Sequence, residues 1–344
     1  MAACPTRRRA GRRCRRGRRR GAIAQRNSTP CLPLAARPMS ALPFPTSLNA
    51  PNSPSSSGTG AAAQSPSAVI YTQRATVPDT PVQQTFDIDC QLQYDVGGPS
   101  DFLFQIHAQQ GMDQTVLSES LVITPNLPRH VFADPHIGHR FLRLHADAGP
   151  LTLHYQARVQ RTVQPLDPLA AELAIADLPD DLLHNLNPTR YCESDALSQV
   201  TQQMFGQLPR GLRRVQAVVE WIHQNIHYQI GTSNALTTAR DVFNQRAGVC
   251  RDFAHLGVTF CRALNIPARL VVGYASFDDP PPDFHAVFEA YLGGRWVLFD
   301  ATHMSPIDDV VRIATGRDAK DVAFATIYGP ATMLSMAPLV RKLV

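Results

Sequence analysis

The sequence predicts an α+β protein with a disordered N-terminal tail, a small all-β domain and a larger domain of helices packed on an antiparallel sheet. Three observations predict this class: a start rich in arginine, proline and serine, a middle segment of short period-two patterns, and helix-periodic apolar positions from residue 212 onward. A length of 344 residues fits two to three domains of roughly 150 residues. The expected boundaries are 1–66 for the tail, 85–163 for the β domain, 164–190 for a linker and 191–344 for the last domain.

The positive charge is concentrated in the tail. Residues 1–66 contain twelve arginines and no other charged residue, while the whole chain has a formal net charge of +5. The folded part is therefore acidic overall, which argues against specific nucleic-acid binding by a folded basic face. The tail cannot bury enough apolar surface to offset its chain entropy, so we expect disorder. The preferred interpretation is a translation start placed upstream of Met39. A transit peptide, or a polybasic arm that contacts nucleic acid or anionic lipid, is the alternative.

The lack of a secretory or membrane-spanning signal and the cysteine usage favour a cytoplasmic protein. The tail lacks the apolar core of a secretory signal, and no apolar run reaches the ~20 residues that cross a bilayer. The seven cysteines are odd in number and include no C-x-x-C pair. Free thiols in a reducing compartment are therefore expected, with neither a zinc ribbon nor a thioredoxin-like motif.

The segment 86–162 consists of short strand-like patterns. Residues 86–94 alternate apolar and polar side chains with period two, and 102–106, 116–123, 141–144 and 151–159 are similar. Glycine and proline turns separate them, which predicts a small antiparallel sandwich. The histidines of this segment show no repeated ligand spacing, so no metal site is predicted there.

The periodicity changes after the linker. Apolar residues spaced 3, 4, 3 and 4 apart predict an amphipathic helix: Leu212, Val215, Val219, Ile222 and Ile226. His223 and His227 lie one turn apart, but Gln224 stands where the metalloprotease motif H-E-x-x-H has its glutamate, so we interpret them as ordinary helix residues. The Trp221 indole N–H could serve as an oxyanion donor, although a core role is favoured.

Cys250 is the candidate nucleophile. It follows a glycine-containing turn and precedes a helical face that ends before Pro267. At a helix N-terminus, unpaired N–H groups and the helix dipole favour an anion, so a thiolate there becomes reactive. The same N–H groups could hold an oxyanion. Cys90, Cys192 and Cys261 are interpreted as structural, and so is His255 on the helix.

A hairpin provides the partners of this cysteine. The pair Gly293-Gly294 between two apolar strands is a strong two-residue turn signal. The resulting register places His285 and Asp300 on one face as diagonal neighbours, about 7–8 Å apart at Cα. Glu289 shares the face but lies roughly 13 Å along the strand from His285, so Asp300 is the better partner. A nucleophile, a base and an orienting acid together are typical of covalent acyl transfer.

These motifs resemble the core of the transglutaminase-like superfamily. The resemblance rests on 247–256 (AGVCRDFAHL), 265–269 (NIPAR), 272–274 (VGY), 283–286 (DFHA) and 296–302 (WVLFDAT). A wider similarity to bacterial transglutaminase-like cysteine proteins with an N-terminal β domain starts near Phe86 and includes 191–195 and 316–323.

The resemblance implies a papain-like core and a triad of Cys250 as nucleophile, His285 as base and Asp300 as orienting acid. It implies a protein or peptide substrate whose amide is hydrolysed or transferred to an amine through a thioester. Ala301 stands where the family usually has proline, and Val287 where tryptophan is frequent. The acidic calcium-binding clusters of animal transglutaminases are not recognisable, so we expect no calcium, other metal or cofactor. A catalytically inactive module that binds a protein or glycan is the alternative.

Overall fold

The computed structural model describes residues 80–343 except 112, 135–137 and 278–282. The predicted disordered tail at 1–66 lies outside these residues. Within them the chain is α+β, as predicted: two antiparallel four-stranded sheets and a third antiparallel four-stranded sheet that carries helices. All of the described residues belong to one compact unit, Tyr71–Val344.

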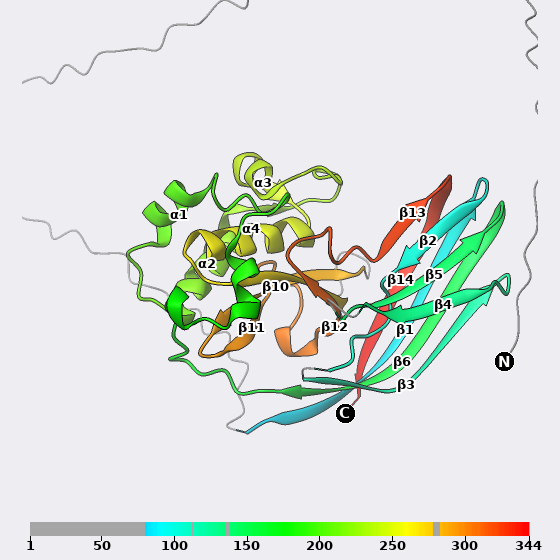
Figure 1. Ribbon diagram of the computed structural model, residues 1–344, viewed down its shortest axis with the longest axis horizontal. Coiled ribbons are helices and arrows are strands. Elements are labelled where there is room, and N and C mark those ends of the chain that lie inside the picture. The colour runs from blue at the N-terminus through cyan, green and yellow to red at the C-terminus, as the bar shows by residue number, and fades with distance from the viewer. Residues whose placement is uncertain (1–79, 112, 135–137, 278–282, 344) are drawn as a thin grey trace, which may run out of the picture. The chain divides into compact units, whose positions relative to one another are not determined.

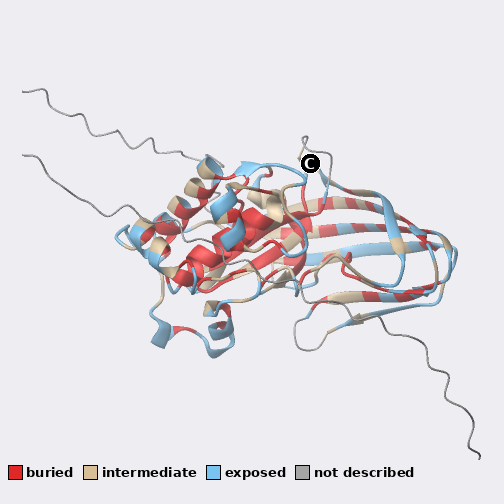
Figure 2. Ribbon diagram, turned by 90° about the horizontal axis from the view of Figure 1, so that it is seen from above, coloured by how far each residue is buried: buried red, intermediate tan, exposed pale blue. Residues whose placement is uncertain are grey.

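The first sheet has the strand order β14-β1-β6-β3. It contains four long strands: β1 (Val82–Val96), β3 (Gln114–Thr124), β6 (Gly149–Val163) and β14 (Ala331–Leu343). Burial alternates along β1 as the period-two pattern predicts, and Figure 2 shows this alternation along the long strands. One face of the sheet therefore lies in the core and the other faces solvent.

The second sheet has the strand order β13-β2-β5-β4. Its strands are short: β2 (Ser100–Phe104), β4 (Arg129–Ala133), β5 (Arg140–Ala146) and β13 (Ala325–Tyr328). The ring of Tyr94 on β1 packs against Phe102 and Phe104 on β2, with centroids 5.7 and 5.8 Å away. These aromatic contacts join the buried faces of the two sheets into a sandwich.

The C-terminal strands complete this sandwich. The sequence placed all of 191–344 in one domain, yet β14 pairs with β1 along its whole length and β13 pairs with β2. Figure 1 shows the red strand β14 beside the cyan strand β1. Residues 325–343 therefore satisfy their backbone hydrogen bonds in the N-terminal sheets, which local sequence patterns do not reveal.

The third sheet forms the base of the remaining part, with strand order β11-β10-β9-β12. Its strands are β9 (Ala268–Tyr274), β10 (His285–Leu292), β11 (Arg295–Phe299) and β12 (Val311–Gly316). Figure 1 shows the helices grouped beside this sheet. They are α1 (Ser198–Phe205), α2 (Leu212–Asn225), α3 (Ala239–Gln245) and α4 (Cys250–Ala263).

Helix α4 is the central element because it contacts β9, β10 and the other three helices. Residues 252–263 of α4 are all buried. Gly257 allows a close approach to the sheet, since a Cβ there would lie 2.5 Å from Cε1 of Phe288 on β10. The apolar positions predicted for α2 are buried as well, which confirms that helix.

The predicted linker is ordered against this core. It carries the 3-10 turns η1 (Ile175–Asp177) and η2 (Asp180–Leu186). The Gly293 N–H at the β10–β11 turn donates to the Ala171 carbonyl (2.8 Å), and the Leu212 N–H at the start of α2 donates to the Ala170 carbonyl (2.9 Å). A further 3-10 turn is η3 (Ile307–Asp309).

A buried charge network connects the sandwich to the third sheet. The Arg312 guanidinium on β12 binds Glu289 on β10 at 2.7 Å and Asp113 beside β3 at 2.6 Å. Arg161 on β6 donates to the Val310 carbonyl at 2.6 Å. Glu289 is fully buried, so its carboxylate cannot be solvated by water and is compensated by the Arg312 guanidinium.

Candidate active site

Cys250 is the first residue of α4, as the sequence predicted. The preceding residues 247–248 form β8 (Ala247–Gly248), which pairs in parallel with β7 (His227–Tyr228). The Asp252 carboxylate accepts from the Val249 N–H at 2.9 Å and so caps the helix start. Gly248 is required here because a Cβ would lie 2.7 Å from the Asp252 Cβ. The turn and the cap therefore fix the position of Cys250.

The β10–β11 hairpin positions the other two residues. The pairing of Leu292 with Arg295 confirms the register derived from the two glycines, which have φ of +58° and +80°. His285 is the first residue of β10, and Asp300 directly follows β11. Their side chains are joined by a hydrogen bond of 2.9 Å between His285 Nε2 and Asp300 Oδ2.

Asp300 is held by bonds to both of its oxygens. Its Oδ1 accepts from the N–H (2.8 Å) and the hydroxyl (2.7 Å) of Thr302, and its Oδ2 accepts from the Ser305 N–H at 3.3 Å. Burial raises the pKa of this carboxyl, but the bonds from His285 and Thr302 outweigh it and hold the pKa below its ordinary value. Asp300 is therefore a carboxylate with a fixed orientation.

His285 is buried, and the groups beside it shift its pKa. Burial lowers its pKa, while the hydrogen bond and charge of Asp300, together with Cys250, raise it to about 10. Its Nδ1 has no hydrogen-bond partner among the described residues. Since Nε2 is engaged by Asp300, Nδ1 is the ring nitrogen that remains available for a hydrogen bond.

The Cys250 sulfur lies beside the start of β10, where the thiol donates to the Phe284 carbonyl at 3.9 Å. Cys250 is half-buried, whereas Cys90, Cys192 and Cys261 are buried. Burial raises the pKa of the Cys90 and Cys192 thiols to about 12. The structure thus brings together the three residues predicted for the site, and Cys250 is the accessible cysteine of the described part of the chain.

The other candidates from the sequence have structural surroundings. Trp221 packs on Phe243 and beneath the Arg246 guanidinium, 4.9 Å from its ring centroid. His255 is buried, stacks on Tyr191 and accepts from the Ala319 N–H, and burial lowers its pKa to about 3. It is therefore a neutral packing residue.

Arg251 and Asp252, which follow Cys250 on α4, and His223 on α2 also have local partners. Asp252 binds Arg251 at 2.9 Å as well as capping α4. His223 stacks on His303 with ring centroids 4.0 Å apart. The prediction of His227 as a helix residue is wrong: α2 ends at Asn225, and His227 is exposed on β7. In the part of the chain that the structure describes, no group of three or more His, Cys, Asp or Glu side chains could hold a metal ion.

Tyr228 is a residue near the site that no sequence pattern marks. This residue pairs with Gly248 through the β7–β8 bridge, and its ring lies 5.9 Å from that of Phe253 on the first turn of α4. No periodicity marks a strand of two residues, so only the fold brings this residue to the start of α4. The two departures from the family pattern, Val287 and Ala301, are buried core residues.

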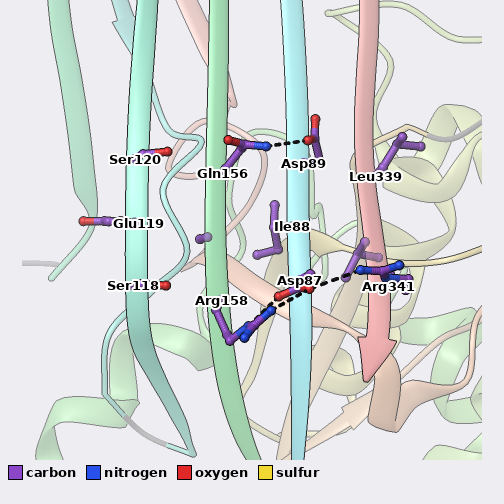
Figure 3. Close-up of a pocket in the computed structure, with 12 residues that line it drawn as sticks. Asp87, Ile88, Asp89, Ser118, Glu119, Ser120, Gln156, Arg158, Leu339 and Arg341 are labelled. Atoms are coloured by element: carbon purple, nitrogen blue, oxygen red, sulfur yellow. Dashed lines mark hydrogen bonds and ion pairs between the residues drawn. The ribbon is translucent and has the colours of Figure 1, made fainter. Parts of the chain in front are cut away.

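A separate hollow lies on the solvent face of the first sheet and is shown in Figure 3. Its charges pair with each other: Asp87 binds Arg158 at 2.7 Å and Arg341 at 3.3 Å. Asp89 accepts from the Gln156 amide at 2.8 Å. None of the three candidate site residues lines this hollow.

Comparisons with known proteins identify the class. The model of the transglutaminase-like superfamily matches residues 198–301, and that of the bacterial transglutaminase N-terminal domain matches residues 84–181. A crystal structure described as a "Putative Cysteine Protease" from Cytophaga hutchinsonii is similar at 40% identity and a TM-score of 0.74. The match covers 77% of this chain and 93% of that one. The chain belongs to the transglutaminase-like superfamily and has the general fold of its cysteine enzymes.

Two curated relatives are uncharacterized mycobacterial proteins. The Mycobacterium leprae protein is 27% identical over 161 residues, which are 44% of this chain and 56% of the relative. A Mycobacterium tuberculosis protein is 30% identical over 115 residues, which are 29% of this chain and 37% of the relative. The chain thus spans about half or less of the length of these relatives. Among the described residues, no helix is long and apolar enough to cross a membrane.

Proposed function

We propose that this protein is a cysteine enzyme that cleaves amide bonds of proteins or peptides through Cys250, His285 and Asp300. The observation that carries the proposal is the buried His285–Asp300 hydrogen bond of 2.9 Å behind the half-buried Cys250 at the start of α4. A charged imidazole beside the sulfur stabilises a thiolate, and so does the helix N-terminus. The description of the Cytophaga hutchinsonii structure as a cysteine protease supports the same class.

The geometry suggests the order of steps. The Cys250 thiolate attacks the amide carbonyl carbon, and N–H groups at the start of α4 receive the negative charge on oxygen. His285 gives a proton to the leaving nitrogen, the C–N bond breaks, and a thioester remains. Water or an amine then attacks the thioester while His285 takes its proton, and Cys250 leaves as thiolate. Asp300 keeps the imidazole oriented throughout.

Water as acceptor gives hydrolysis, and an amine as acceptor gives acyl transfer. Both share the first half-reaction, so the proposal covers a peptidase or amidase and an acyltransferase. We also propose that the protein is cytoplasmic and that its reaction needs no metal or cofactor. The predicted division into a β domain and a catalytic domain also remains a proposal.

The test is site-resolved alkylation by iodoacetamide across pH, read by mass spectrometry, for wild type and His285→Ala. Cys250 should label quickly below pH 7 in wild type and no faster than an ordinary thiol, with a pKa near 8.5, in the variant. His154→Ala is the matched control, because His154 binds Asp89 at 2.9 Å on the sandwich surface. Ordinary labelling of Cys250 in wild type would favour the inactive binding module.

A further inference from the structure

The turn that follows Asp300 sets the orientation of its carboxylate. Asp300 Oδ1 accepts from the N–H and the hydroxyl of Thr302, and Oδ2 accepts from the Ser305 N–H. These donors belong to the chain just beyond Asp300 itself. The carboxylate is therefore held toward His285, at 2.9 Å, only while the turn 301–305 keeps its path.

His303 lies in the middle of this turn in an unusual backbone conformation. Its φ is +58°, in the left-handed region, which costs free energy for a residue with a Cβ and persists where the surroundings hold it. Its half-buried ring stacks on the ring of His223, with centroids 4.0 Å apart and planes tilted by 22°. The stack therefore holds the turn in a conformation that the backbone alone does not favour.

The stack also joins the two layers of the candidate site. Cys250 begins α4 in the helical layer, whereas Asp300 follows β11 of the third sheet. His223 lies near the end of α2, and α2 packs against α4. The contact between His223 and His303 therefore ties the turn of the acid to the helices that carry the nucleophile.

The charges around the stack fit uncharged rings. Burial and the neighbouring His223 lower the pKa of His303, while the charges of Glu220 on α2 and of Asp300 oppose this shift. His303 is therefore neutral at neutral pH. A neutral ring stacks on His223 without charge repulsion.

We propose that His223 and His303 are positioning residues, whose ring stack holds the Asp300 carboxylate against His285. This inference rests on the proposed function, since it explains how one member of that triad is kept in place. Without the stack the turn relaxes and the hydrogen bond between His285 and Asp300 weakens. The charged imidazole is then less favoured, so the Cys250 thiolate is lost first at low pH.

The experiment measures site-resolved alkylation of Cys250 by iodoacetamide in the full-length chain at pH 6.5 and at pH 9. The readout is the rate at pH 6.5 divided by the rate at pH 9. A general loss of structure changes both rates, whereas misplacement of Asp300 lowers the rate at pH 6.5 selectively. The ratio therefore separates positioning from a merely structural role.

The variants remove or keep the stacked rings. His223→Ala removes a ring from an exposed position of α2, where alanine preserves the helix, and His223→Phe keeps a ring that stacks. His303→Asn removes the other ring and tolerates the positive φ. His130→Ala is the matched control, because His130 stacks on Phe132 in the sandwich, with centroids 5.3 Å apart.

An ordinary thiol with a pKa near 8.5 reacts about 80-fold more slowly at pH 6.5 than at pH 9, which sets the largest possible effect. We expect His223→Ala and His303→Asn each to lower the ratio by about 3- to 30-fold. The double variant should lower it no further, because the two rings act as one unit. His223→Phe and His130→Ala should stay within about twofold of wild type.

An unchanged ratio in His223→Ala would overturn the inference, because Asp300 would then keep its place without the stack. An equal fall in His223→Phe would overturn it as well, since a stacking ring would not restore the ratio. Additive losses in the double variant would show that the two residues act separately. Failure of the proposed function is seen in the wild type, as the ratio of an ordinary thiol that His285→Ala leaves unchanged.

Discussion

The substitution Asp300→Asn tests the site most directly because it keeps the shape of the side chain and changes one hydrogen-bonding group. Oδ1 of Asp300 accepts two bonds from Thr302, so an asparagine keeps its oxygen there and turns its NH₂ toward His285. His285 Nε2 must then accept instead of donate. The ring proton moves to Nδ1, the nitrogen that Asp300 does not engage.

The expected loss follows from this tautomer. An imidazole with its proton on Nδ1 cannot take a proton from the thiol, and without the carboxylate the charged form is no longer favoured. Burial alone lowers the His285 pKa, so its value should fall well below the about 10 of the wild type. The corresponding change in a serine protease triad lowers the rate about 10⁴-fold, and we expect a loss of about 10³- to 10⁴-fold in acylation.

The assay measures the release of p-nitrophenolate as p-nitrophenyl acetate acylates the enzyme. Alkylation of Cys250 by iodoacetamide is followed in parallel between pH 5 and pH 9. Wild-type alkylation should persist below pH 7, while Asp300→Asn should react only where an ordinary thiol ionises. Asp87→Asn on the sandwich surface controls for a general effect of the substitution. Full acylation activity in a folded Asp300→Asn protein would refute the role of Asp300 and the reasoning from tautomers.

The remaining predictions concern stability, measured as the free energy of unfolding in urea. The raised pKa of His285 contributes stability that is complete below pH 6.5 and is lost as the pH rises toward about 10. The lowered pKa of Asp300 contributes stability that is present above pH 3.8 and is lost as the pH falls below that value. The difference between wild type and Asp300→Asn should therefore be largest between these two ordinary values, and a pH-independent difference would contradict the ion pair. Arg312→Met should cost up to about 3–5 kcal/mol, because the buried Glu289 loses one of its two guanidinium partners and keeps only Arg269. Arg158→Met on the surface should cost about 0–1 kcal/mol, and equal costs would argue against the buried network. Gly257→Ala should cost about 1–3 kcal/mol, since the new Cβ would overlap the Phe288 ring, and a neutral effect would show that the α4–β10 contact can open.

Local patterns determined much of the candidate site. The apolar spacing of α2 and the period-two pattern of β1 correspond to buried faces because side-chain direction follows directly from backbone geometry. The pair Gly293-Gly294 fixed a two-residue turn, and a two-residue turn fixes the register of its strands. The proximity of His285 to Asp300 could therefore be worked out from residue numbers alone.

Contacts between distant segments were decided by tertiary structure. Nothing in the pattern of 325–343 predicted that these strands return to β1 and β2, and nothing in a two-residue strand predicted that Tyr228 pairs with Gly248 just before α4. The resemblance to a family placed the start of α4 against the hairpin, whereas the spacing of the motifs did not. The physical reason is that periodicity records which face of an element is buried. Which other element covers that face is determined by packing and backbone pairing across the whole chain. Gly257 is an example, because the missing Cβ allows α4 to pack closely against Phe288.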